Sequence, residues 1–180
     1  HGQPYIYGFG HVHYSGVGCK IGGNVILMPQ SGVLNIDPAS NRSSYSGENA
    51  SPGFYEVYLD DYSVKAQITA TQRCGISKYI FDVPEAHITL DLSHPINGVT
   101  GGYVKAVSGN ELEGFELDGG FCGSRLKYKV YFVVKFNQEA QKFGVYYDGK
   151  IKKENVAEGE NAGAFYSFNL EDDKELIEFF

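Results

Sequence analysis

Residues 127–136 read KYKVYFVVKF, and this stretch decides the fold class. Every even-numbered position from Tyr128 to Phe136 is apolar, whereas the odd-numbered positions include three lysines. Alternation with a period of two places successive side chains on opposite faces of a β-strand. The stretch therefore predicts a strand with one face in an apolar core and the other face in water or under a second layer.

Shorter alternating runs occur along most of the chain. Residues 87–92 alternate apolar and polar side chains, and residues 56–71 contain two further runs around a short turn. Asp148-Gly149 separates two more runs in the manner of a two-residue hairpin turn. Because the apolar faces of such strands cannot be buried by a single sheet, the sequence predicts an all-β, two-layer antiparallel β-sandwich.

Composition narrows the class of protein further. The chain has 180 residues, 42% hydrophobic and 21% charged, which is the apolar content of one ordinary globular domain. The net charge is −7 and no basic cluster occurs, so we expect no nucleic-acid partner. No stretch approaches the ~18 consecutive apolar residues of a spanning helix, so we expect no membrane span.

The cysteines and one serine-rich stretch give expectations about local structure. Cys19, Cys74 and Cys122 form an odd, widely spaced set without a Cys-x-x-Cys pair, so we expect three free thiols rather than a disulfide framework or a zinc site. The serine-rich residues 40–52 are expected to form one long polar loop. The first residues lack the features of a signal peptide, which leaves localisation open at this point.

The densest unusual segment is residues 7–19, which read YGFGHVHYSGVGC. Glycine at this density lets the backbone approach a ligand closely. In an extended chain His11 and His13 lie on the same side, where they could share a metal ion, bind sugar hydroxyls, or hold the loop through hydrogen bonds to carbonyl groups. A metal site would need a third ligand, which only His87, His94 or a distant carboxylate could supply.

Several ordered motifs resemble those of glycoside hydrolase family 92. Residues 5–19 (YIYGFGHVHYSGVGC) and 23–29 (GNVILMP) are similar to that family's Gly-Phe-Ser-His-Thr-His-Leu-Ser-Gly-Thr-Gly segment and the Met-Pro strand after it. Residues 47–62 (GENASPGFYEVYLDDY) and 64–73 (VKAQITATQR) resemble its Glu-x-x-x-Pro-Gly-Tyr-Tyr and Ala-Glu-Leu-Thr-Ala-Thr-x-Arg stretches. Residues 129–136 continue the likeness, which covers most of the chain.

The resemblance implies a fold and an activity. Members of the family are calcium-dependent, inverting exo-α-mannosidases with an amino-terminal β-sandwich of the galactose-mutarotase-like supersandwich type and a carboxy-terminal helical barrel. The chain, residues 1–180, is then expected to be the sandwich domain alone, cut at both ends. Calcium and the catalytic carboxylates are expected on the helical domain, and inversion needs two carboxylates ~6.5–9.5 Å apart, for which this sequence offers no pair. The fragment by itself is expected to be inactive.

The same resemblance nominates residues that line the cleft between the two domains. They are expected to bind an α-mannoside or N-glycan-type carbohydrate, with no catalytic or metal-binding residue among them. Leaving-group selectivity is expected at Cys19 and Lys20. The substrate-binding set is Phe9, Gly10, His11, His13, Ser15, Gly16, Cys19, Lys20 and Glu48.

Two other functions fit the sequence. A self-standing carbohydrate-binding sandwich would use the same loops without hydrolysis, and a sandwich that only braces a partner would use none of them. If the family resemblance holds, the whole protein is expected to be secreted, periplasmic or attached to the cell surface, with the helical barrel of the same protein as the partner of this domain.

Overall fold

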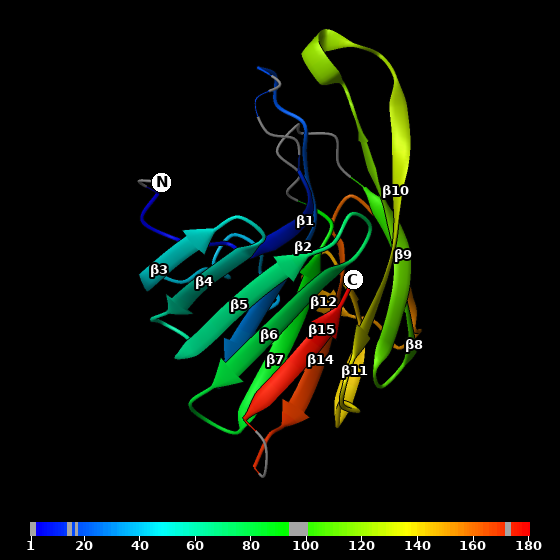
Figure 1. Ribbon diagram of the computed structural model, residues 1–180. Helices are drawn as coiled ribbons and strands as arrows, with labels where there is room; N and C mark the ends of the chain where they lie inside the picture. The colour runs from blue at the N-terminus through cyan, green and yellow to red at the C-terminus, as the bar shows by residue number, and fades with distance from the viewer. Residues whose placement is uncertain (1–2, 14–15, 17, 94–100, 172–173) are drawn as a thin grey trace.

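The computed structural model of the protein describes residues 3–13, 16, 18–93, 101–171 and 174–180. Its strands form two antiparallel sheets that lie face to face, as Figure 1 shows. Within these residues the only helical element is a 3₁₀ turn, η1 (Phe121–Gly123). The predicted all-β, two-layer antiparallel sandwich is therefore confirmed.

Each sheet has a defined spatial order of strands. The smaller sheet runs β1 (Phe9–His13), β2 (Gly22–Ser31), β7 (Glu85–Asp91), β14 (Ala162–Asn169), β11 (Lys142–Tyr147) and β12 (Lys150–Ile151). The larger sheet runs β13 (Val156–Gly159), β8 (Gly102–Ser108), β9 (Glu111–Gly119), β10 (Lys127–Phe136), β15 (Glu175–Phe179), β6 (Gly75–Phe81), β5 (Val64–Ala70), β4 (Phe54–Leu59) and β3 (Tyr45–Ser51).

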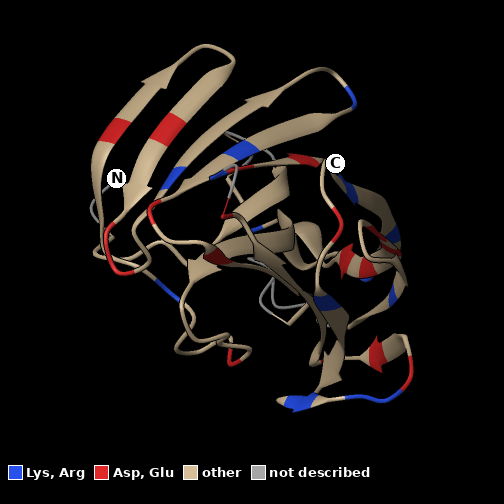
Figure 2. Ribbon diagram, turned by 90° about the horizontal axis from the view of Figure 1, so that it is seen from below, with Lys and Arg blue, Asp and Glu red and all other residues tan. Residues whose placement is uncertain are grey.

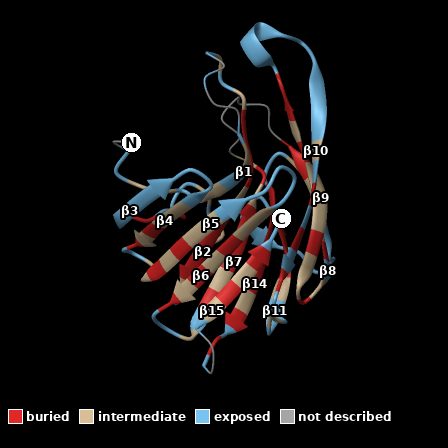
Figure 3. Cartoon of the chain, in the orientation of Figure 1, coloured by how far each residue is buried: buried red, intermediate tan, exposed pale blue. Residues whose placement is uncertain are grey.

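Strand β10 has the two-faced character that its sequence predicts. Phe132, Val134 and Phe136 are buried in the core between the sheets, whereas Tyr131 and Val133 are exposed on the outer face. Figure 3 shows the same division along most strands, with buried residues alternating with intermediate or exposed ones. The core is thus formed by the inward-facing positions of both sheets.

The smaller sheet is buried on its outer face as well, around strand β7. Thr89 belongs to the polar phase of that strand but is only 2% exposed. Its hydroxyl accepts hydrogen bonds from the side-chain amides of Gln30 (3.0 Å) and Asn41 (2.9 Å). Gln30 in turn bonds the backbone of Asn35 in both directions. The segment after β2 therefore covers this face and satisfies its polar groups.

Charged residues on the larger sheet pair across neighbouring strands. Lys135 lies 2.9 Å from Glu111, and Lys65 lies 3.0 Å from Glu56. Figure 2 shows positive and negative residues interspersed over the strands rather than gathered by sign. Pairs this exposed contribute little stability individually, so the core carries the fold.

The expected long loop over residues 40–52 is wrong in its second half. Strand β3 occupies Tyr45–Ser51 and pairs with β4, with a register shift between Ser46 and Asn49. The strand lies at the edge of the larger sheet, and its residues after Tyr45 are exposed. Its pairing depends on backbone hydrogen bonds and on polar side-chain contacts such as Tyr55 to Glu48, so no apolar alternation marks it in the sequence.

The expectation of three free thiols is also wrong. Cys19 and Cys122 form a disulfide with their Cα atoms 5.4 Å apart, and Cys74 is free and exposed. The two bonded cysteines are 103 residues apart in the sequence, and the hairpins β1–β2 and β9–β10 bring them together at one end of the sandwich. Pairing depends on distance in the fold, which the spacing of cysteines does not reveal.

Neighbouring valines on β10 give a test of the layered core. Val134→Ala should lower the free energy of unfolding by about 1.5–3 kcal/mol, because its fully buried side chain would leave a cavity. Val133→Ala, on the 45% exposed side of the same strand, should change it by less than about 0.5 kcal/mol. Urea denaturation of both variants measures the difference, and equal losses would contradict the assignment of the two faces.

Candidate functional site

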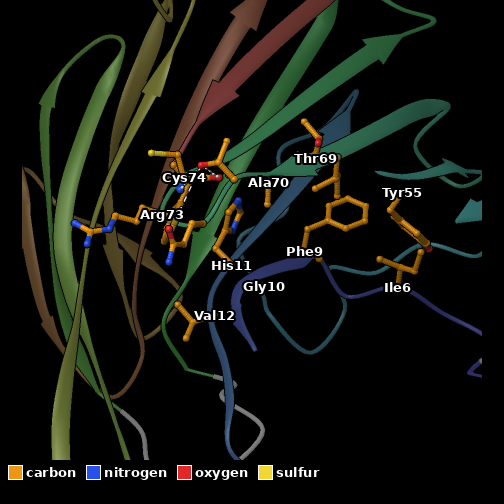
Figure 4. Close-up of a pocket in the computed structure, with 16 residues that line it drawn as sticks. Ile6, Phe9, Gly10, His11, Val12, Tyr55, Thr69, Ala70, Arg73 and Cys74 are labelled. Carbon is orange, nitrogen blue, oxygen red and sulfur yellow. Dashed lines mark hydrogen bonds between the residues drawn. The ribbon is translucent and has the colours of Figure 1, made fainter. Parts of the chain in front are cut away.

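The site expected around the glycine-rich segment lies along strand β1. A cavity of about 620 Å³ is lined on one side by Gly8 to Val12 and on the other by the turn between β5 and β6, which contains Arg73 and Cys74. Tyr55 of β4 and Phe180 complete its wall. Figure 4 shows these side chains arranged around the cavity.

His11 lines this cavity and is held in place by groups that accept hydrogen bonds. Its Nδ1 lies 3.2 Å from the carbonyl oxygen of Val25, and its Nε2 lies 2.9 Å from the Glu178 carboxylate. The ring also stacks on that of Phe180, with centroids 4.2 Å apart. A carbonyl and a carboxylate both accept, so the arrangement favours a ring with a proton on each nitrogen. The Tyr79 hydroxyl donates to the other Glu178 oxygen at 2.8 Å.

The charge state of His11 follows from these contacts. Burial acts to lower the pKa of the imidazole, but the hydrogen bond and the negative charge of Glu178 outweigh it and raise the pKa above its ordinary value. The side chains of His11 and Glu178 are 6% and 0% exposed. They form a buried ion pair that joins β1 of the smaller sheet to β15 of the larger sheet.

A second buried carboxylate holds the start of strand β2. The Val25 backbone N–H donates to Glu116 of β9 at 2.5 Å, and Val25 has a φ of 55°, which is rare for a branched residue. Burial raises the pKa of Glu116 to about 7, against the lowering effect of the Val25 hydrogen bond. The nearby charges of Asp91 and Asp118 raise it further.

The structure separates the two histidines that the sequence places together. The register of β1 against β2 shifts between Val12 and His13, which interrupts the alternation of faces. His11 is buried, whereas His13 is exposed. His11 bonds a carbonyl group, which is one of the three roles that the sequence allows, and it also lines the cavity.

The remaining predicted residues fall into three groups. Phe9 and Gly10 line the cavity, and Phe9 stacks on Tyr79 with centroids 6.4 Å apart. Gly16 and Lys20 are exposed beyond the end of β1, and Ser15 lies outside the described residues. Cys19 is disulfide-bonded, so it presents no free thiol to a substrate. The role in leaving-group selectivity that the resemblance predicts for Cys19 would therefore depend on where Cys19 holds the chain and not on a thiol group.

Glu48 belongs to the edge strand β3 and contacts the cavity only through a second residue, Tyr55. Its carboxylate accepts a hydrogen bond from the Tyr55 hydroxyl at 3.0 Å, and Tyr55 lines the cavity. Burial and the Glu48 bond both raise the pKa of Tyr55, so the phenol stays protonated and donates. Glu48 therefore orients a cavity residue from its outer side.

Sequence reasoning missed several residues of the site, among them Tyr55, Glu178 and Phe180. Glu178 and Phe180 sit in the same alternating phase as the buried Leu176, so Glu178 places a carboxylate where the pattern calls for a core side chain. That signal was available, because a buried carboxylate requires a partner. The sequence does not show that the partner is His11.

The described residues do not fit a calcium site. None of them form a group of three or more His, Cys, Asp or Glu side chains that could hold a metal ion. Ca²⁺ takes six to eight oxygen ligands, usually with several carboxylates among them. Nothing in the described part of the chain would hold the ion that the resemblance implies.

Comparison with known families gives the class of this protein. The family model described as "Glycosyl hydrolase family 92 N-terminal domain" matches residues 1–178. The chain therefore belongs to this family. No match was found among curated proteins. The described part of the chain has no helix long and apolar enough to cross a membrane.

Solved structures with the same fold come from this family. The α-mannosidase BT3965 from Bacteroides thetaiotaomicron is 24% identical over 99% of this chain, with a TM-score of 0.87, and its complex with mannoimidazole is 25% identical with a TM-score of 0.88. The inverting mannosidase BT2199 from Bacteroides thetaiotaomicron VPI-5482 is 15% identical over 86% of the chain, with a TM-score of 0.71. The chain spans only 26% of BT3965 and 21% of BT2199.

The buried ion pair predicts a pH-dependent effect on stability. The pKa of His11 is higher in the folded protein than in the unfolded chain, so protonated His11 stabilises the fold. This stabilisation is complete below the ordinary histidine pKa and is lost as the pH rises through the folded-state pKa. His11→Ala should thus cost about 3–5 kcal/mol near pH 6, because the buried Glu178 carboxylate loses its charged partner and keeps only the Tyr79 hydroxyl, and less at pH 9.

Urea denaturation between pH 5.5 and pH 9 measures this difference. His13→Ala is the matched control, since His13 is exposed and its loss should matter little at any pH. An effect of His11→Ala that stays constant or grows as pH rises would contradict the ion pair.

Glu116 predicts a pH dependence of a different kind. Because its folded-state pKa of about 7 lies above the ordinary carboxyl value, the wild-type protein loses stability as pH rises from about 4.5 to 7. Glu116→Gln keeps an oxygen for the Val25 N–H and cannot ionise, so it should be more stable than wild type by about 2–3 kcal/mol above pH 7. The two proteins should converge near pH 4.5. Chemical denaturation at pH 5 and pH 8 tests this, and a variant that is less stable at both values would refute it.

Proposed function

We propose that this chain is the N-terminal part of an inverting exo-α-mannosidase, and that the β1 cavity supplies substrate-positioning contacts to an active site completed by a carboxy-terminal helical domain. The observation that carries the proposal is the family match over residues 1–178. It is supported by the similarity to the α-mannosidase BT3965, of whose length the chain spans about a quarter.

The chemistry of the cavity suits a positioning role. Its wall combines aromatic surface from Phe9 and Tyr55 with polar groups from Thr69, Gln72 and Arg73, a combination that binds a sugar by its apolar face and its hydroxyls. Holding a substrate in the reactive orientation lowers the barrier even where proton transfer is performed by other residues. No catalytic step is assigned to a residue of this chain, and the chain alone is expected to be inactive.

Calcium belongs to the same proposal but not to these residues. The ion would be held by the helical domain, where it would supply positive charge to sugar oxygens, since the described residues offer no ligand set. The role of this chain is then to orient the sugar from the opposite side of the cleft.

We also infer the compartment in which the protein acts and the class of its substrate. The Cys19–Cys122 disulfide supports an oxidising compartment, in line with a secreted, periplasmic or surface-attached enzyme. The described neighbours come from Bacteroides thetaiotaomicron, which favours a bacterial source for this chain, and one of them is a complex with mannoimidazole, which favours α-linked mannosides. N-glycan-type carbohydrates are the substrates we propose.

Hydrolysis of α-linked mannobioses tests the function directly. The product of the whole gene should release mannose in the presence of calcium, and a chelator should abolish the release. The 180-residue chain should release none under either condition. An active short chain would show that its own residues complete the chemistry.

If neither protein released mannose, the result would contradict the proposed function. Binding of mannosides by a protein that hydrolyses none of them would identify a carbohydrate-binding sandwich, and the absence of binding would leave only a bracing role. Circular dichroism of each protein establishes that a protein without activity is folded.

A further inference from the structure

The end of the β9–β10 hairpin stands away from the body of the sandwich. Residues 120–129, here called the arm, are all exposed, and Figure 3 shows this end of the hairpin beyond the two layers. Leu126 at its tip is 78% exposed and Phe121 is 38% exposed. Packing against the core therefore does not hold the arm in place.

After β1, the described residues Gly16, Gly18 and Lys20 are exposed as well. Gly16, Gly18, Cys19 and Lys20, here called the glycine loop, lie between strands β1 and β2. Gly16 and Gly18 have φ values of 74° and 73°, and each has open space where a side chain would begin. Glycines in left-handed conformations gain much conformational entropy when released, so such a loop needs an external restraint to keep one shape.

The Cys19–Cys122 disulfide joins these two elements. Cys19 is the third of the glycine-loop residues, and Cys122 is the middle residue of η1 in the arm. The bond links a hairpin of the smaller sheet to a hairpin of the larger sheet. A cross-link between two exposed segments restricts the conformations of both.

We propose that the Cys19–Cys122 disulfide is a positioning element for the substrate: it fixes the glycine loop against the arm and so sets the affinity of the site for the sugar. The inference rests on the proposed function and extends it to residues outside the cavity. Strand β1 lines the cavity with Gly10, His11 and Val12 and leads directly into the glycine loop. The first residue of the glycine loop, Gly16, is only four positions along the chain from Val12 of the cavity wall.

The first experiment measures the restraint without any need for activity. Lys20 and Arg125 flank the disulfide, and both are exposed sites for trypsin. In the whole gene product, Cys122→Ser should speed cleavage after Lys20 and Arg125 about tenfold or more, as mass spectrometry of the released peptides would show. Mild reduction of the wild-type protein should do the same. Cleavage after the exposed Lys152 should not change.

The second experiment measures the consequence for substrate. Cys19→Ser and Cys122→Ser should each raise KM for α-mannobiose about tenfold while changing kcat by less than about twofold, because the loss lies in positioning. The double variant should match either single variant, since one bond is the functional unit. Ser124→Ala is the matched control: it alters the arm two residues from Cys122 and keeps the disulfide, so KM should stay at the wild-type value.

Each result decides a separate point. Unchanged cleavage after Lys20 and Arg125 would overturn the positioning role. Faster cleavage with unchanged KM would show that the bond restrains the loop but does not serve the substrate. A fall in melting temperature with KM and kcat intact would identify a purely structural bond. A wild-type protein that hydrolyses no mannoside would instead overturn the proposed function, and the cleavage rates would still decide whether the disulfide restrains the loop.

Discussion

The site depends on the ion pair between His11 and Glu178, which lies buried between the two sheets. Burying two charges costs several kcal/mol per ion, and the cost is recovered only where every lone pair and proton has a partner. Here the His11 imidazole contacts the Val25 carbonyl oxygen and the Glu178 carboxylate. The Glu178 carboxylate also accepts a hydrogen bond from the Tyr79 hydroxyl. The pair fixes the position of β1 against the larger sheet, and with it the wall of the cavity.

Glu116 repeats the arrangement one strand further along the smaller sheet. It reaches from β9 to the Val25 backbone, so a carboxylate of the larger sheet again holds the smaller one. Apolar packing alone, as around Val134 and Leu90, would let the sheets slide with little directional preference. Hydrogen bonds between the sheets specify one orientation near the cavity, at a cost in stability that the rest of the core offsets.

Sequence periodicity predicted the parts of the fold that burial dictates. The alternation in residues 127–136 and 87–92 identified strands because one face of each lies in the core. Strand β3 escaped prediction because an exposed edge strand is held by its backbone, and the disulfide escaped because proximity arises only in three dimensions. In the site, the glycine-rich strand was recognisable, but the partner of His11 lies 167 positions further along the chain. The roles of the nominated sugar-binding residues stay predictions.

The disulfide also has a consequence for how the chain folds. Its two cysteines belong to hairpins of different sheets, so they meet only after the layers have docked. Oxidation of this pair therefore comes late and marks a sandwich that has assembled correctly. The exposed Cys74 is a competitor during that interval, because three cysteines allow three pairings and only one of them matches the native topology. Export into an oxidising compartment would thus favour fast collapse of the two sheets, since a slow chain would be trapped by the wrong bond.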